Sequence, residues 1–192
     1  FSAGQRNLRL LRGEAVFEVA HDASRPFVVT AGNERITALG TIFSVRRSDE
    51  ETVVALIEGS VGVEKDIPDA VDKPNMSIRL NPGQQARSGG ATSRFEVARV
   101  NVDRALSWRT GRLIFDNERL ADAIEEVNRY STRKLVLEDA ELADLRISGA
   151  FKTGSAEKFA SAISVALPVT VEPGGHSTAL VIKPDPARAS PR

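Results

Sequence analysis

The chain has 192 residues, of which 41% are hydrophobic and 27% charged, a composition typical of one large or two small globular domains. Its 26 basic residues balance 26 acidic ones, so it lacks the basic surplus that binding to a nucleic-acid backbone requires. The absence of cysteine excludes disulfides, thiolate zinc sites and cysteine nucleophiles.

No segment reaches the roughly 18 consecutive apolar residues expected of a membrane-spanning helix. The sequence opens at Phe1, within a few residues of a predicted strand at residues 7–11, and no signal peptide precedes that strand. We therefore expect a fragment whose export signal or membrane anchor lies upstream.

Residues 1–99 are dominated by alternation of apolar and polar residues with a period of two, which is typical of half-buried strands. Ala15, Phe17 and Val19 share one face of the first clear example. Further strands are predicted at residues 27–30, 36–39, 41–45 and 53–57, separated by turns rich in Gly, Pro and Asn. This pattern predicts an N-terminal all-β roll or sandwich.

A weak internal repeat relates residues 11–18 to residues 57–64. In both, a strand ends in a charged residue and a glycine, Gly13 or Gly59, and a new alternating strand follows. Glycine adopts backbone angles that other residues resist, so the repeat predicts two similar corners.

Two segments show neither strand nor helix periodicity. Residues 66–75 contain two prolines and three aspartates and are predicted to be a mobile, solvated loop between strands. Residues 185–192 are predicted to be a disordered tail.

From Gly111 onward the periodicity changes and predicts a small two-layer α+β domain at residues 111–184, a β-α-β-β-α-β unit followed by one more strand. The predicted strands are residues 112–115, 135–137, 145–151, 169–171 and 179–182. The first helix carries Leu120, Ala123, Ile124, Val127 and Tyr130 on one face, with Asp116 or Asn117 as its N-cap. The second begins after Ser155 and carries Phe159, Ala162, Ile163, Ala166 and Leu167. The predicted fold class is therefore mainly β plus α+β.

Residues 100–110 are predicted to link the two domains, with a short helix at residues 103–108. This segment carries the only tryptophan, Trp108. We expect its large ring to pack domain surfaces together at the junction, because a tryptophan can bury about 150–250 Å².

The sequence offers no catalytic residues, metal ligands or cofactor-binding motif. His21, Asp22 and Ser24 are adjacent at the end of a strand, whereas the members of a catalytic triad converge from separate elements. Hydrogen bonds within a turn are the expected role. His176, the other histidine, lies too far away in sequence to form a zinc motif with His21, and no phosphate-binding loop is present. We therefore expect a protein that is not an enzyme.

Several segments in the first 115 residues resemble the FecR family of cell-surface-signalling regulators. They are residues 10–22 (LLRGEAVFEVAHD), 25–29, 36–45 (ITALGTIFSV), 54–61, 80–86 (LNPGQQA) and 108–115 (WRTGRLIF). The part after Gly111 resembles the small domain found at the N-terminus of secretins and TonB-dependent receptors and at the C-terminus of FecR proteins.

The resemblance implies a periplasmic region of a single-pass inner-membrane anti-sigma factor. Its expected partner is the N-terminal signalling domain of an outer-membrane TonB-dependent transporter, often one for iron siderophores. Binding would lead to regulated proteolysis and control of an extracytoplasmic-function sigma factor. The sequence departs from the family at its start, where the cytoplasmic sigma-binding segment, the transmembrane helix and the first periplasmic strands are missing.

The expected docking site is an edge strand of the second domain, to which a partner strand could add. The candidate residues, short and apolar, are Leu135, Val136, Leu137, Leu180, Val181 and Ile182. The alternative is that these residues only pack the core.

Two rival functions remain open at this stage. One is a carbohydrate- or peptidoglycan-binding envelope module, which would need a cluster of exposed aromatic residues. The chain has eight Phe, one Tyr and one Trp, and most Phe fall in the buried phase of their strands. The other is a hydrolase, which the lack of catalytic residues disfavours.

Overall fold

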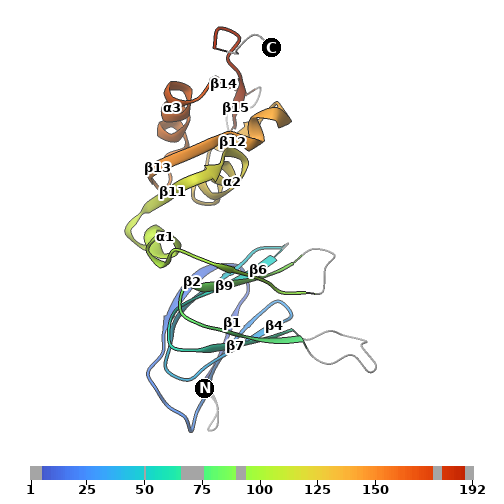
Figure 1. Cartoon of the computed structure of the whole chain (residues 1–192), viewed down its shortest axis with the longest axis vertical. Coiled ribbons are helices and arrows are strands. Elements are labelled where there is room, and N and C mark those ends of the chain that lie inside the picture. The colour runs from blue at the N-terminus through green and yellow to red at the C-terminus, as the bar shows by residue number, and fades with distance from the viewer. Residues whose placement is uncertain (1–5, 50, 66–75, 90–93, 175–178, 189–192) are drawn as a thin grey trace. The chain divides into compact units, whose positions relative to one another are not determined.

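The computed structural model describes residues 6–49, 51–65, 76–89, 94–174 and 179–188 (Figure 1). The chain divides into two compact units, Phe1–Ala105 and Leu106–Arg192. Each unit has its own cluster of buried hydrophobic residues.

The N-terminal unit consists of two five-stranded sheets, with strand orders β1-β3-β4-β7-β8 and β10-β9-β6-β5-β2. The strands are β1 (Arg6–Leu10), β2 (Gly13–Glu18), β3 (Phe27–Ala31), β4 (Glu34–Ala38), β5 (Ile42–Arg47), β6 (Glu51–Glu58), β7 (Val61–Lys65), β8 (Met76–Leu80), β9 (Gln84–Gly89) and β10 (Glu96–Arg99). All neighbouring strands are antiparallel except β1 and β3, which run parallel.

One buried core joins the two sheets. The first sheet contributes Val29, Ala31, Ile36, Ala38, Val61, Val63 and Leu80, and the second contributes Phe43, Val45, Val54, Leu56 and Ala86. Alternate residues of each strand therefore face the other sheet, as in a β-sandwich. The ring centroids of Phe17 and Phe43 lie 5.2 Å apart. The predicted N-terminal β-sandwich is confirmed.

The internal repeat corresponds to two places where the chain passes from one sheet to the other. Gly13 connects β1 of the first sheet to β2 of the second, and Gly59 connects β6 of the second to β7 of the first. Their φ angles are 100° and 88°, in the region that favours glycine. A Cβ atom on Gly59 would also lie 2.7 Å from Thr41 Cγ2. The repeated sequence therefore marks two corners of the same kind.

A short helix α1 (Val102–Leu106) and a 3-10 helix η1 (Ser107–Thr110) precede the strands of the C-terminal unit. Its elements are β11 (Arg112–Arg119), α2 (Leu120–Tyr130), β12 (Lys134–Leu137), the 3-10 helix η2 (Ala140–Asp144), β13 (Arg146–Lys152), α3 (Ala156–Ala166), β14 (Val169–Pro173) and β15 (Ala179–Pro184). The α+β class and the order of strands and helices are as predicted.

The strands of the C-terminal unit form two small sheets, an antiparallel pair β11-β13 and a three-stranded sheet β12-β15-β14. Both α2 and α3 contact strands of both sheets. The helices thus lie between the sheets, giving three layers in place of the two expected. Each sheet keeps its other face on the outside.

The apolar faces of α2 and α3 fill the core of this unit. Leu120, Ala123, Ile124 and Val127 of α2 are buried as predicted. On α3, Phe159 and Ile163 are buried as predicted, but Ala166 is exposed and Ala160 takes part in the core instead. The Phe159 ring lies 4.9 Å from that of Phe151 and 6.0 Å from that of Phe115.

The predicted N-cap of α2 is wrong. The strand β11 continues past Asp116 and Asn117, where the register with β13 shifts, and Asn117 adopts a φ of 51°. Arg119 occupies the N-cap position, and Leu120 N donates to Leu145 O at 2.7 Å. Asp116 and Asn117, which local propensity favours as helix N-caps, therefore belong to the bulge of strand β11 instead.

Several predicted features lie outside the described residues: the loop at residues 66–75, His176 and the final residues 189–192. The predicted disorder of residues 185–188 is wrong. Arg188 Nη1 donates to the carbonyl oxygens of Ser164, Val165 and Leu167, each at 3.2 Å, which lie at the C-terminal end of α3.

Candidate partner-binding surface

The six residues predicted to bind a partner lie side by side on β12 and β15. These strands are parallel, with Leu135 opposite Leu180, Val136 opposite Val181 and Leu137 opposite Ile182. The fold thus brings Leu135 and Leu180, which are 45 residues apart in the sequence, side by side in one sheet.

The expectation that both strands lie at a sheet margin is wrong for β15. This strand pairs with β12 on one side and with β14 on the other, so it is the central strand. The expected margin position is correct for β12. The sequence could not show this, because pairing order depends on contacts between distant segments.

Burial divides the six residues into two groups. Leu135, Leu180 and Ile182 point into the core, with exposed fractions of 2%, 8% and 0%, and the partly buried Leu137 packs against the same core. Val136 is 48% exposed, and its neighbour Val181 is half-buried. Because side chains of a strand alternate between faces, Val136 and Val181 share the outer face of the sheet.

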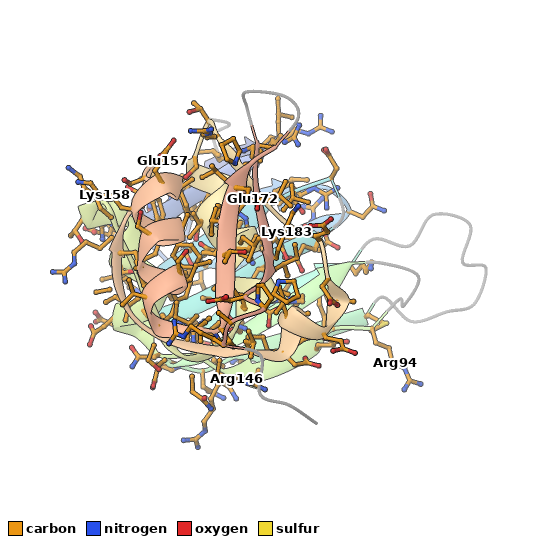
Figure 2. The ribbon with its side chains drawn as sticks, turned by 90° about the horizontal axis from the view of Figure 1, so that it is seen from above. Arg94, Arg146, Glu157, Lys158, Glu172 and Lys183 are labelled. Carbon is orange, nitrogen blue, oxygen red and sulfur yellow. The ribbon has the colours of Figure 1, made fainter. Side chains whose placement is uncertain are left out.

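Three charged residues flank this valine pair and complete the outer β12–β15 face, defined here as Val136, Val181, Glu138, Glu172 and Lys183. Lys183 Nζ lies 3.1 Å from Glu172 Oε2 and 3.3 Å from Glu138 Oε2. Figure 2 labels Lys183 and Glu172 on neighbouring strands. The hydrogen bonds to Glu172 and Glu138 raise the pKa of the Lys183 ammonium above its usual 10.5. Two carboxylates and one ammonium leave this face with one net negative charge.

The open edge of β12 is partly closed by Asn128 of α2. The Asn128 side-chain oxygen accepts from Leu135 N at 2.7 Å, and its amide nitrogen donates to Leu135 O at 2.8 Å. One side chain therefore makes the two bonds that a neighbouring strand would make at this residue. A partner strand cannot add at Leu135 without displacing it. Sequence analysis missed this role, since Asn128 carries no signal beyond its place on a predicted helix.

Trp108 lies in η1 and packs against the core of the C-terminal unit. Its buried Nε1 has no hydrogen-bond partner among the described residues. The predicted packing of this ring against a second domain surface stays a prediction.

The residues that resemble a catalytic triad form a turn. Ser24 Oγ donates to Asp22 Oδ1 at 2.6 Å, and Arg25 Nε donates to Asp22 Oδ2 at 3.0 Å. His21 Nδ1 instead contacts Leu39 O. These bonds agree with the expected turn. Among the described residues no three His, Asp or Glu side chains gather as metal ligands, and none of the described helices has the length and apolar character needed to cross a membrane.

A buried polar cluster in the N-terminal unit was missed by sequence analysis. The Glu34 side chain on β4 is 4% exposed and accepts hydrogen bonds from Ser88 Oγ at 2.6 Å and Thr52 Oγ1 at 2.9 Å. Lys65 Nζ lies 3.9 Å from the same carboxylate. Glu34 and Lys65 belong to the first sheet, whereas Thr52 and Ser88 belong to the second. The cluster therefore ties the two sheets together.

Residues 1–62, all within the N-terminal unit, match the family described as FecR protein. This part of the chain is therefore similar to FecR proteins. A comparison with curated proteins gave no match. This FecR match includes the two glycine corners, Gly13 and Gly59.

Solved structures share the fold of nearly the whole chain. Two crystal structures of a proposed anti-sigma factor from Parabacteroides distasonis ATCC 8503 superpose with TM-scores of 0.74 and 0.73. Each is 24% identical, over 96% of this chain and 82% of the other. The FecR match thus covers residues 1–62, and the two solved structures show the fold of nearly the whole chain.

Proposed function

We propose that this chain is the periplasmic signal-receiving region of a transmembrane anti-sigma factor. In this proposal its C-terminal unit binds the N-terminal signalling domain of an outer-membrane TonB-dependent transporter. The observation that carries the proposal is the outer β12–β15 face, where the exposed Val136 and the half-buried Val181 are surrounded by an ion-paired charged rim. An apolar centre with a polar rim is the usual anatomy of a protein interface.

The proposed partner packs onto this face rather than adding a strand to β12, because Asn128 already bonds both backbone groups of Leu135. Val136 and Val181 supply the apolar contact. The extra negative charge of Glu138 and Glu172 favours a basic group on the partner.

In the proposed pathway, docking marks the loaded state of the transporter. Regulated proteolysis of the anti-sigma factor then controls an extracytoplasmic-function sigma factor. The role proposed for this chain in the pathway is recognition of the transporter.

The test is a calorimetric titration of the chain with purified signalling domains of TonB-dependent transporters from the same genome, which measures their affinity. Val136→Asp places a charge in the apolar centre and is expected to weaken binding at least about tenfold. Val165→Asp is the matched control, because Val165 on α3 is 77% exposed and lies outside this face. Equal affinity of the two variants would reject the face as the site. Failure of every signalling domain to bind the unmodified chain would reject the function.

A glycan-binding function finds less support. Sugar sites need exposed rings, yet none of the large hydrophobic side chains exposed in the described residues is aromatic.

A further inference from the structure

The two-stranded sheet β11-β13 carries a charge arrangement that its own fold does not explain. Arg112 of β11 lies directly opposite Lys152 of β13, and both side chains are exposed (Figure 1 shows the two strands side by side). Like charges directly opposite each other destabilise an antiparallel pair.

The backbone hydrogen-bond pattern brings the side chains of Arg112 and Lys152 closer together than in a hydrogen-bonded pair. Thr153 N donates to Gly111 O at 2.9 Å, so the pair formed by Gly111 and Thr153 is hydrogen-bonded. Because hydrogen-bonded and non-hydrogen-bonded pairs alternate along an antiparallel ladder, Arg112 and Lys152 form a non-hydrogen-bonded pair. In such pairs the side chains are closer, and the N–H and C=O groups point away from the partner strand, toward the two outer edges.

The other end of the same sheet shows how such a repulsion is relieved internally. Arg119 lies opposite Arg146, but Arg119 donates to Asp144 Oδ1 from Nε at 2.9 Å and from Nη2 at 2.8 Å. Among the described residues neither Arg112 nor Lys152 has an acidic partner. Asp144 therefore neutralises one like-charge pair within the chain. The positive charge of Arg112 and Lys152 is not neutralised by any described residue.

Next to the uncompensated pair lies a small apolar patch. Ile114 is 36% exposed and faces Ala150, which lies on the same outer face as Arg112 and Lys152. Three consecutive residues of β13, Ser148 to Ala150, are small and exposed. Small residues on a strand let another backbone approach closely.

Of the two edges of this sheet, β13 is the one suited to receive a strand. β11 is interrupted by the register shift next to Asn117, and bulges are a common protection of edges. The extra residue of this bulge lies on β11 and not on β13. No hydrogen bond within the described residues uses the outward backbone groups of Ala150 and Lys152.

We propose that the outer edge of β13 binds an extended acidic segment of a partner protein by strand addition. A carboxylate of the segment lies opposite Lys152, with Arg112 one strand further away on β11, where it adds to the positive charge. Two residues along, an apolar side chain lies opposite the small Ala150, beyond which Ile114 stands on β11. The recognised pattern is acidic-x-apolar, with main-chain bonds giving affinity and this alternation giving specificity.

A second copy of the chain fits this edge poorly. If two β13 strands paired antiparallel about Gly149, Lys152 of one would face Arg146 of the other, adding a second like-charge contact. The edge also belongs to a different sheet from the outer β12–β15 face, so this inference does not depend on the transporter proposed above.

The probe is a capped peptide, Glu-Thr-Val-Thr-Glu-Thr-Val-Thr, added to the whole 15N-labelled chain and followed by amide NMR shifts. The largest shifts are expected at Ser148, Gly149, Ala150 and Lys152. A peptide with Lys in place of Glu is expected to bind more weakly, and added salt to weaken the acidic peptide.

Lys152→Glu is expected to weaken the acidic peptide about fivefold at low ionic strength. Its matched control is Lys158→Glu, the same charge change on the exposed face of α3 (Figure 2), which should leave affinity unchanged. Ala150→Pro removes one outward N–H, which an edge strand tolerates, and should abolish binding. If Ala150→Pro fails to fold, the comparison of the two lysine variants decides.

Three outcomes would overturn the proposal: no shifts in β13, equal affinity of Lys152→Glu and Lys158→Glu, or concentration-dependent dimerisation that Lys152→Glu alters. The last would make a second copy the occupant.

Discussion

The two units of the chain place their charged residues in opposite ways. The N-terminal sandwich closes one core between its two sheets and holds a carboxylate, Glu34, inside that core. The C-terminal unit packs its two helices against both small sheets and leaves charged residues exposed on the helices and on the outer sheet faces. A buried ionic cluster fixes the pairing of two sheets, whereas exposed charges around small apolar patches favour docking. The comparison teaches that the C-terminal unit is the better candidate for recognition.

The largest expected effect tests whether the two cores are energetically separate. Phe159→Ala removes the centre of the aromatic cluster with Phe115 and Phe151, and should lower the free energy of unfolding of the C-terminal unit by about 3–5 kcal/mol. Trp108 packs against this core, so its fluorescence during urea unfolding reports on the unit.

The matched variant is Phe43→Ala in the sandwich core. It should leave the midpoint of the Trp108 transition unchanged while destabilising the N-terminal unit by a similar amount. If both variants shifted the Trp108 midpoint equally, the two cores would unfold as one.

The next effect concerns the buried cluster. Glu34→Gln keeps the shape but leaves Lys65 without a carboxylate, and should destabilise the N-terminal unit by about 2 kcal/mol. Glu64→Gln, on the exposed side of β7, should change stability by less than about 0.5 kcal/mol. Guanidinium unfolding followed by far-UV circular dichroism measures both, and equal effects would show that Glu34 has no special role.

A smaller effect is expected at the protected edge of β12. Asn128→Ala removes both bonds to Leu135 and should cost about 1–2 kcal/mol. The Leu135 amide should also exchange with deuterium faster. Asn128→Asp keeps the acceptor for Leu135 N, so it should retain more of the protection. Unchanged exchange in Asn128→Ala would mean that another group covers this edge.

The smallest effect is the pH dependence of the turn at Asp22. The hydrogen bond from Ser24 lowers the pKa of the Asp22 carboxyl from 3.8 to about 2, with Arg25 also contributing. A lowered pKa in the folded state means that the contribution to stability is present above pH 3.8 and is lost as the pH falls toward 2. Carboxyl NMR titration should show this, with Ser24→Ala returning the pKa toward 3.8. A titration unchanged by Ser24→Ala would contradict the assignment of the shift to this bond.

Periodicity alone predicted most of the fold, because it reports which face of each element is buried. The strand predicted at residues 27–30 appears as β3 (Phe27–Ala31), and the helical spacing of Leu120, Ala123, Ile124 and Val127 appears as the buried face of α2. Strand order was not predictable in the same way. Nothing in the local sequence of β15 shows that it pairs on both sides, so the predicted margin position failed there.

The polar features were missed for a different reason. Glu34 lies in phase with Ile36 and Ala38, so the alternation of β4 already points its side chain inward. That signal was available in the sequence. Asn128 gave no such signal, because its partner Leu135 lies beyond the end of the helix and is reached only in the folded unit.

The position of β15 also bears on the order of assembly. Ala179–Pro184 is the final described strand, yet it is the one that holds β12 and β14 together. Until ribosomal synthesis releases this segment, the two earlier strands have no common neighbour, and the three-stranded sheet must wait for it. A protease cut just before Ala179 would, by the same reasoning, dismantle this sheet in a single step while leaving the β11-β13 pair with its own hydrogen bonds.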